Sequence, residues 1–403
     1  MTFERAYAAG PYTWASLPAI MSSTYPLMFK YGSLIDRCSI SEVLSRKHYM
    51  TVCSENILLL PGIYKGFRMI VRRKYPILDL VTPFYMNRFL RRLIGKMDAV
   101  FMPYTHICSS HIPHIIHHVV TSNKINTNNF FFWFHILDTH DPYIFDEFLP
   151  HLICLLKLSR VKRTFCFRRN HIAPQKTLIK EFMNLYKHAI DKVGKDLREV
   201  LEVLNDLTED YIVIVTGDHG EEFYEHGAFG HEGMYYKGCY ITHLYEELIH
   251  VPLIIISSRH SSKHKRCNAL VSHLDIMPTF LEYVGLKRYA RGCIGTSLLK
   301  YFRETNISPG REYVITEATA VHFEPLFNEL GSAYAIIHVN GLKYVFHPIT
   351  GEAIYDLRHD PYERQKVYVE ESTIKEFRGI LVKHIKSKSV YEVKHKLLRK
   401  WLN

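Results

Sequence analysis

The sequence of 403 residues has eight cysteines, and none of them forms a CxxC pair. This spacing excludes the common zinc and redox-dithiol motifs and mildly favours a reducing, cytoplasmic setting. The longest apolar runs, such as 129–137 and 251–256, fall far short of the roughly 18 to 20 residues of a membrane-spanning helix, so no transmembrane segment is expected. The N-terminus also lacks a basic segment followed by an apolar one, so no signal peptide is recognisable.

The chain has a formal net charge of +11, which suits an anionic substrate, nucleic acid or a membrane surface. No helix-turn-helix, zinc-finger or RNA-binding signature accompanies this charge, so a nucleic-acid partner is not expected. The segment 160–169 is basic with two aromatic residues, and we interpret it as a solvated loop rather than an anion-binding surface. The lysine-rich segment 373–402 has helical apolar spacing, typical of a helix packed on one face, with a membrane-surface helix as the alternative.

Strand-like and helix-like patterns alternate along the chain, which predicts an α/β sandwich with a mostly parallel central sheet. The spacing predicts one long helix or two over 178–207, and a turn followed by a helix over 272–285. Segments 334–344 and 345–357 predict a small antiparallel sheet. We therefore expect a catalytic domain over residues 1–300 and a smaller α+β subdomain with a basic helix over 301–403.

The most informative segment begins with an apolar run, 211–215, that predicts a buried strand. The run delivers Asp218 and His219 at its carboxyl end, where ligands bind in open α/β sheets. A carboxylate beside an imidazole suits a divalent metal, and Gly217 and Gly220 let the backbone approach it closely. Gly230-His231 and the sequence 245–247 (YEE) follow in order.

Two further segments carry candidate catalytic residues. Thr13 precedes a run, 16–21, that can open a helix, and a helix N-terminus stabilises an anion near such a hydroxyl. A plain N-cap is the commoner use of threonine in this position. The aromatic run 130–134 predicts a buried strand that is followed by Asp138 and His140, and a histidine at a strand end can protonate a leaving group.

Together these motifs resemble the sulfatase branch of the alkaline phosphatase superfamily. The resemblance extends from Phe3 to Glu363, with a final YDLxxDPxE-like stretch over 355–363. It implies an alkaline-phosphatase-like sandwich with one divalent metal ion, held by Asp218, His219 and the Thr13 oxygen. It also implies that His140 and His231 bind the ester, with His243 competing with His231 for the second substrate-contacting position. The metal is zinc, manganese or calcium, and the donor set favours zinc or manganese over calcium.

The nucleophile motif departs from the sulfatase pattern. Aligning Ser22-Ser23 with the family's Thr-Gly pair puts Thr13 in the position of the Cys or Ser that becomes formylglycine. Ala15 then replaces the motif's proline, and Leu17 replaces its arginine. Threonine instead resembles the nucleophile of nucleotide pyrophosphatase/phosphodiesterases and of phosphoethanolamine and lipoteichoic-acid transferases of the same superfamily.

The family's first strand, which ends in a metal-binding aspartate, would precede the phenylalanine equivalent to Phe3. We therefore expect an incomplete start, with an inactive member of the family as the alternative. The predicted function is a metal-dependent hydrolase of sulfate or phosphate esters that uses Thr13 as the nucleophile. Its expected partner is an anionic ester of a small molecule, glycan or lipid. The alternatives are a phosphodiesterase or phosphoethanolamine-type transferase, and a non-catalytic binding relic of the fold.

Overall fold

The computed structural model describes the chain over residues 1–28, 32–54, 60–72, 107–122, 129–141, 143, 176–231, 233–236, 239–260, 265–303, 310–319 and 331–387. The chain divides into two compact units. Unit 1 comprises Met1–Val43, Leu60–Lys65 and Asp210–Asn403, and unit 2 comprises Leu44–Leu59 and Gly66–Glu209. Across the described ranges, helices that combine the length and the apolarity needed to cross a bilayer are absent.

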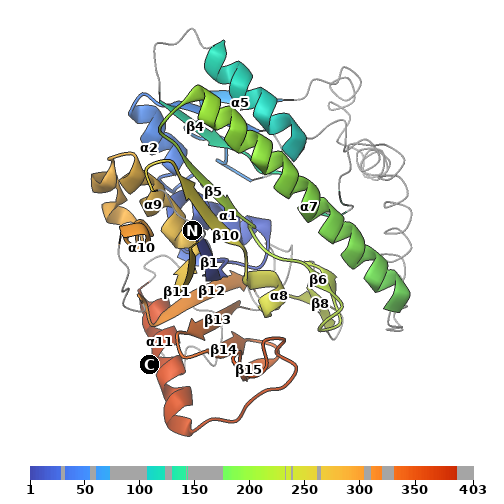
Figure 1. The fold of residues 1–403 in the computed structure, drawn as a ribbon. Coiled ribbons are helices and arrows are strands. Elements are labelled where there is room, and N and C mark those ends of the chain that lie inside the picture. The colour runs from blue at the N-terminus through green and yellow to red at the C-terminus, as the bar shows by residue number, and fades with distance from the viewer. Residues whose placement is uncertain are drawn as a thin grey trace, which may run out of the picture. The chain divides into compact units, whose positions relative to one another are not determined.

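The main sheet of unit 1 has four strands in the order β11-β1-β10-β5 (Figure 1). These strands are β1 (Thr2–Tyr7), β5 (Ile212–Thr216), β10 (Leu253–Ser257) and β11 (Arg266–Ser272). Strand β1 is parallel to β11, whereas β10 is antiparallel to both of its neighbours, β1 and β5. Strands β1, β5 and β11 therefore all run in one direction, and their carboxyl ends lie at the same edge of the sheet.

The predicted α/β class is confirmed, with two corrections of detail. The central sheet is mixed rather than uniformly parallel, because β10 runs against the other three strands. The run predicted as a buried strand, 211–215, does form β5, but every residue of β5 is only half-buried. The physical reason is that β5 is the last strand of this sheet and hydrogen-bonds to β10 on one side alone among the described strands.

Short helices and hairpins connect these strands. The helices of unit 1 include α1 (Thr13–Ser22), α8 (Glu246–Ile249), α9 (Ile276–Tyr283) and α10 (Lys300–Arg303), with 3-10 turns η1 (Pro26–Met28), η4 (His273–Asp275) and η5 (Lys287–Gly292). Helix α2 (Ile40–Arg46) begins in unit 1 and ends in unit 2. Two small antiparallel ladders follow β5, formed by β6 (Glu222–Phe223) with β7 (Phe229–Gly230), and by β8 (Met234–Tyr236) with β9 (Cys239–Ile241).

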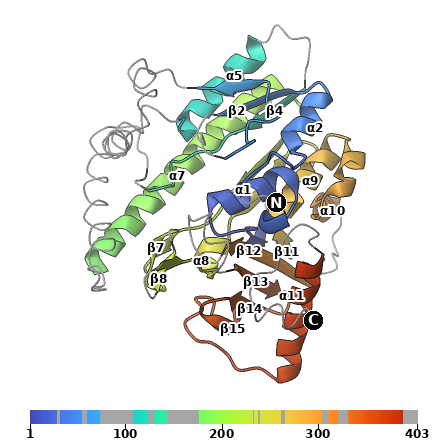
Figure 2. The ribbon, with the colours of Figure 1, turned by 180° about the vertical axis from the view of Figure 1, so that it is seen from behind.

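A second sheet of unit 1 is formed by strands between residues 313 and 356. It is antiparallel throughout, in the order β12 (Tyr313–Thr319), β13 (Ser332–His338), β14 (Leu342–His347) and β15 (Gly351–Asp356). Helix α11 (Glu371–Lys386) lies against it (Figure 2) and contributes Phe377, Leu381 and Ile385 to a core shared with Ile336 and Tyr344. The predicted antiparallel sheet is thus confirmed, while the predicted domain boundary at residue 300 stays a prediction.

Unit 2 has a parallel three-stranded sheet in the order β3-β2-β4. Its elements are β2 (Met50–Ser54), β3 (Met69–Val71), β4 (Phe130–Trp133), η3 (Ser109–His111), α5 (Ile112–Thr121) and α7 (Lys176–Leu207). Helix α7 confirms that 178–207 is one long helix, and its Val200 packs on Ile112 and Ile116 of α5. The strand predicted at 130–134 forms, but Phe131 is its one buried residue. The basic segment 160–169 and the end of the basic C-terminal segment, 388–402, lie outside the described residues.

A buried lysine joins the C-terminal sheet to α8. Lys343 of β14 is fully buried, and its Nζ lies 3.0 Å from Glu246 Oε1 and 2.8 Å from Glu363 Oε1. Burial alone would lower the pKa of Lys343, but the two carboxylates outweigh it and raise that pKa. Lys343 thus links Glu246 of the YEE stretch to Glu363 of the DPxE stretch, although the two stretches are far apart in the sequence.

Replacing Lys343 with alanine is expected to destabilise the protein strongly. The substitution would leave the buried Glu363 carboxylate and the partly buried Glu246 carboxylate without their cation. Such a change costs about 3–5 kcal/mol of unfolding free energy. Urea unfolding monitored by circular dichroism measures this effect. The matched control is Lys366→Ala, which removes an exposed lysine and should change the free energy by less than about 0.5 kcal/mol. Equal stability of the two variants would show that the buried pairs contribute nothing.

Candidate active site

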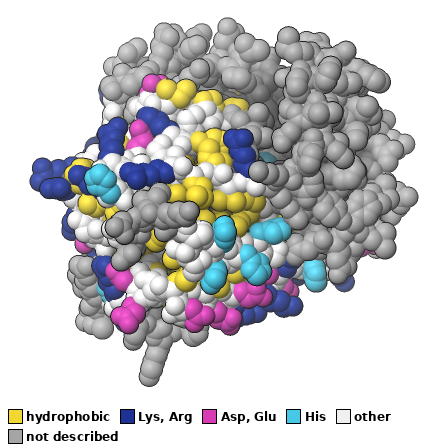
Figure 3. Space-filling model, turned by 90° about the horizontal axis from the view of Figure 1, so that it is seen from above, with side chains coloured by type: hydrophobic (Ala, Val, Ile, Leu, Met, Phe, Trp, Pro, Cys, Tyr) yellow, Lys and Arg dark blue, Asp and Glu magenta, His cyan; other side chains and the backbone are white. Residues whose placement is uncertain are grey.

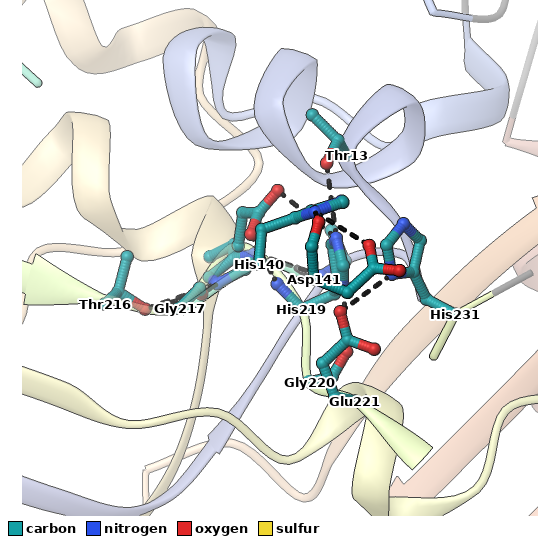
Figure 4. A network of polar contacts seen from close by, with 12 residues as sticks. Thr13, His140, Asp141, Thr216, Gly217, His219, Gly220, Glu221 and His231 are labelled. Carbon is teal, nitrogen blue, oxygen red and sulfur yellow. Dashed lines mark hydrogen bonds and ion pairs between the residues drawn. The ribbon is translucent and has the colours of Figure 1, made fainter. Parts of the chain in front are cut away.

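Three parallel strands of unit 1 place the candidate residues. After β1 the chain turns through Gly10 into α1, which begins at Thr13. After β5 it turns into Asp218 and His219, and after β11 it turns into His273. Because the carboxyl ends of these strands share one edge of the sheet, residues more than 200 positions apart in the sequence converge there. Figure 4 shows Thr13 pointing from the first turn of α1 toward the His219 ring.

Thr13 is the first residue of α1, so its hydroxyl lies at the helix N-terminus. The preceding residue, Tyr12, makes no side-chain cap, and the first turn contains no acidic residue. The helix N-terminus therefore keeps its favourable field for a bound anion. A glycine is needed at position 10 for the chain to pass close to α1, since a Cβ on Gly10 would lie 2.2 Å from the Ala15 Cβ.

The other end of α1 supports the register that assigns Thr13. Ser23, which stands in the position of the family's glycine, has φ 52° and ψ 38°, the left-handed conformation that favours glycine. Ser16, the other hydroxyl in this turn, is fully buried. Thr13, by contrast, is partly exposed, so it is the hydroxyl of the pair that a substrate can reach.

His219 presents a nitrogen lone pair to Thr13. Burial lowers the pKa of His219 despite the opposing effect of Asp218, so the ring is neutral near pH 7. Its Nδ1 lies 2.8 Å from the Gly220 carbonyl oxygen, which only accepts, so Nδ1 carries the proton. The Nε2 lone pair is then directed to the Thr13 side, 3.2 Å from Thr13 Oγ1.

These atoms fit the metal ion that the resemblance implies. Asp218 Oδ2 lies 3.6 Å from His219 Nε2, and Nε2 lies 3.2 Å from Thr13 Oγ1. Ligands about 2.1 Å from a tetrahedral ion are about 3.4 Å apart, so both separations suit a shared cation. Asp218 Oδ1 accepts the His219 backbone N–H at 3.1 Å, which orients the carboxylate. The donor set of carboxylate, neutral imidazole and hydroxyl therefore fits a divalent ion.

Gly220 fixes the loop that carries these ligands. Its N–H donates to the Leu248 carbonyl of α8 at 2.8 Å, and a Cβ on Gly220 would lie 1.9 Å from the Glu247 carbonyl oxygen. Gly220 thus permits a close contact with the backbone of α8, whereas the predicted approach of the Gly217 and Gly220 backbone to a metal stays a prediction. At Gly217 the nearest atom to an added Cβ would be 3.3 Å away, so this glycine is less tightly constrained.

His231 lies beside His219, with ring centroids 4.3 Å apart. Its Nδ1 lies 3.0 Å from Glu221 Oε1, so this carboxylate orients the ring (Figure 4). The sequence prediction overlooked Glu221, although its position directly after Asp218-His219-Gly220 was the available signal. Unit 1 therefore brings together four of the predicted site residues, which are Thr13, Asp218, His219 and His231.

The other two predicted histidines are placed differently. His243 is buried in unit 1, and its Nε2 lies 2.8 Å from Glu222 Oε2. His140 belongs to unit 2, where its Nδ1 lies 2.6 Å from the carbonyl oxygen and 3.0 Å from Oδ1 of Asp141, so Nδ1 donates to its own neighbour. Their predicted roles in substrate binding stay predictions. Histidines are also common on the surface, as Figure 3 shows, so exposure alone identifies none of the 25 as functional.

Asp138, which the aromatic strand also delivers, has structural partners in unit 2. The Ser109 hydroxyl donates to its Oδ1 at 2.6 Å, and Lys192 Nζ lies 3.3 Å from the same oxygen. Lys192 also pairs with Asp196 at 2.9 Å, within α7. This network joins the turn after β4 to η3 and α7. It gives Asp138 a structural role that requires no part in catalysis.

His273 is a positioning residue that the sequence prediction missed. It is buried, its Nδ1 accepts the Ala9 N–H at 3.4 Å, and its Nε2–H donates to the Gly217 carbonyl at 3.0 Å. The neutral ring thus bridges the connection after β1 and the loop after β5. Burial lowers the pKa of His273 to about 4.

This pKa predicts a pH dependence of stability. Between about pH 4 and 6.5, His273 is protonated in the unfolded chain but not in the folded chain. The free energy of unfolding therefore decreases as the pH falls through this window. The expected contribution is about 3 kcal/mol. Urea unfolding from pH 4 to 7.5 measures it, with His273→Gln as the comparison. Between pH 7.5 and 4, the free energy of unfolding of the glutamine variant should fall by about 3 kcal/mol less than that of the wild type. An equal fall in both proteins would contradict the assignment.

Asp218 and His219 follow the end of β5 and face the Thr13 hydroxyl at a helix N-terminus. This arrangement on an α/β sheet is expected of the alkaline phosphatase superfamily. The model of the family described as Sulfatase matches residues 1–286, and the model described as N-sulphoglucosamine sulphohydrolase, C-terminal, matches residues 230–390. The chain belongs to the sulfatase family.

Individual proteins show the same relationship. The multifunctional alkaline phosphatase superfamily protein PehA of Trinickia caryophylli is 26% identical over 204 residues, which are 46% of this chain and 36% of PehA. The phosphonate monoester hydrolase of Agrobacterium radiobacter has a similar structure, with a TM-score of 0.66 at 14% identity, covering 98% of this chain and 90% of that one. A structure in complex with its substrate D-glucosamine-2-N,6-O-disulfate gives a TM-score of 0.67 at 14% identity, covering 98% and 92%. The chain spans about a third of the length of the curated relatives it matches.

Proposed function

We propose that this chain is the catalytic part of a metal-dependent ester hydrolase in which Thr13 attacks a phosphate or sulfate ester. The observation that carries the proposal is the 3.2 Å contact between Thr13 Oγ1 and His219 Nε2, at a helix N-terminus and beside Asp218. Family membership supports the reaction class, since sulfatases hydrolyse esters of strong oxyacids.

The residues of unit 1 divide the work of the reaction. Thr13 supplies the attacking oxygen, which lies 3.2 Å from His219 Nε2. The amides at the start of α1 stabilise the anionic ester that approaches Thr13. Asp218, His219 and Thr13 would hold the divalent ion, which supplies charge neutralisation and activation of the hydroxyl. His231, oriented by Glu221, would contact the ester and protonate the leaving oxygen.

Phosphorus is the favoured reacting centre. Threonine has no route to formylglycine, so a sulfated aldehyde hydrate is not available for elimination. A phosphothreonine ester is an ordinary covalent intermediate that water or an acceptor alcohol resolves. Leu17, in the position of the sulfatase arginine, is fully buried and supplies no cation to a sulfate. A phosphodiesterase or phosphoethanolamine-type transferase, acting on a lipid- or glycan-linked ester, would use the same residues.

A turnover panel tests the proposal. The full chain, supplied with zinc or manganese, is assayed with aryl phosphate, bis-aryl phosphate and aryl sulfate. Release of the phenol from a phosphate ester at a rate above that of aryl sulfate supports the proposal. A preference for the diester would favour the phosphodiesterase alternative. Metal-dependent turnover of aryl sulfate alone would reverse the choice of phosphorus, and no turnover of any ester would favour the binding relic.

A further inference from the structure

A second group of acidic and imidazole side chains lies next to the candidate active site but outside it. Glu222 of β6, His243 after β9 and Glu247 of α8 place ligand atoms within 4.8 Å of one another. All three belong to unit 1, and Figure 1 shows β6 near α8. Glu222 and His243 are buried, and the Glu247 side chain is 13% exposed.

The central contact in this group is the ion pair between Glu222 and His243, whose two atoms are not aligned as in a hydrogen bond. His243 Nε2 and Glu222 Oε2 lie 2.8 Å apart as a buried ion pair, and neither atom makes a hydrogen bond to another described residue. Among the described residues, the buried His243 Nδ1 also has no hydrogen-bond partner. Burying such atoms is costly, and two adjacent atoms that do not point at each other are suited to share a third partner.

The remaining atoms of the two carboxylates are already held in place. Glu222 Oε1 accepts the backbone N–H groups of His226 and Ala228 at 2.8 and 2.7 Å, which leaves Oε2 facing His243. Glu247 Oε1 lies 2.5 Å from His226 Nδ1, so Nδ1–H donates to it. The His226 ring is itself fixed, because it stacks on Tyr245 with centroids 3.6 Å apart.

We propose that Glu222, His243 and Glu247 form a second, structural site for a divalent transition-metal ion such as zinc, with His226 orienting Glu247 from outside. Two carboxylates, a neutral imidazole and one water would complete a neutral four-coordinate site. Ligands of such an ion lie about 3.4 Å apart, so entry of the ion would open the 2.8 Å contact by about half an ångström. The ion would tie β6, which follows Asp218 and His219 in sequence, to α8.

Metal counting tests this proposal without an activity readout. The full chain is stripped with a chelator, reloaded with a slight excess of Zn²⁺, desalted and analysed for zinc per chain. We expect two zinc ions in the wild type and one in Glu222→Gln, His243→Ala or Glu247→Gln. Asp218→Ala should also retain one, and the combination of Asp218→Ala with His243→Ala should retain none. Circular dichroism confirms that each counted variant is folded.

A matched control is Glu225→Gln, which removes a nearby carboxylate that is outside the ligand set and should leave two zinc ions. His226→Ala should keep the three ligands but weaken the second zinc by roughly 10- to 100-fold, as loss of an orienting partner does. One zinc in the wild type that disappears in Asp218→Ala would overturn the second site. One zinc that disappears in His243→Ala but survives in Asp218→Ala would instead support the second site and count against the metal ligands of the proposed function. The conservative glutamine variants keep the test decisive if His243→Ala fails to fold.

Discussion

Thr13→Ala should lower turnover of the best ester substrate by roughly 10³-fold or more while leaving the protein folded. Removing a covalent nucleophile abolishes the intermediate and leaves only the contribution of binding and electrostatics. Thr13 is partly exposed at the start of α1, so its loss opens no cavity in the core. The measurement is kcat with aryl phosphate, together with the thermal unfolding midpoint.

Two controls separate the hydroxyl from its surroundings. Thr13→Ser keeps an attacking oxygen and should retain measurable turnover. Ser16→Ala removes the buried hydroxyl one turn later and should keep nearly full activity. A radiolabelled phosphate ester, quenched during turnover, should label the peptide that contains Thr13. Full activity in Thr13→Ala, or a label that Ser16→Ala removes, would show that the register set through Ser22-Ser23 is wrong.

The motifs that follow strands could be predicted from the sequence, because each strand end is marked by a change from β-branched apolar residues to glycine and polar residues. Asp218 and His219 follow β5 in this way, and Thr13 follows β1 after Gly10. The shared direction of β1 and β5 then brings them together, as expected for an α/β sheet. Local pattern and topology agree here, and this agreement is why the site was predictable from widely separated segments.

The antiparallel direction of β10 was not predictable in the same way. Its sequence, LIIIS, is a continuous apolar run that suits a strand of either direction. Direction is decided by the connection from β5, which passes through two small ladders and α8 before β10 begins. Those short elements have little periodicity of their own, so pattern alone does not reveal that the chain reverses.

Contacts between residues far apart in the sequence could not be predicted either. His273 contacts Ala9 and Gly217, more than 50 residues away in each case, and nothing around it distinguishes it from an N-terminal turn residue. Lys343 lies in an ordinary strand and is recognised as a clamp only when Glu246 and Glu363 are seen on either side of it. His243 was predicted to compete with His231 for a substrate contact, and the structure adds a partner that the sequence did not indicate, because His243 Nε2 lies 2.8 Å from Glu222 Oε2.

Asp218→Ala should both lower turnover strongly and remove one metal ion per chain. The Asp218 carboxylate is 19% exposed and is oriented by the His219 N–H, with Oδ2 3.6 Å from His219 Nε2. Losing this ligand would leave a neutral imidazole and a hydroxyl, which hold a divalent ion poorly because no charge is left to neutralise it. We expect affinity for zinc at this site to fall by at least about 100-fold and kcat to fall by roughly 10³-fold.

The informative comparison is with charge removal elsewhere. Asp206→Ala removes an exposed aspartate near the end of α7 and should change neither metal content nor turnover. Asp218→Asn keeps the shape of the side chain and should lose metal as Asp218→Ala does, because the charge rather than the volume is required. If excess zinc restores turnover in Asp218→Asn, the carboxylate acts through metal affinity. Unchanged metal content with full activity in Asp218→Ala would remove Asp218, and with it the strand-end metal centre, from the mechanism.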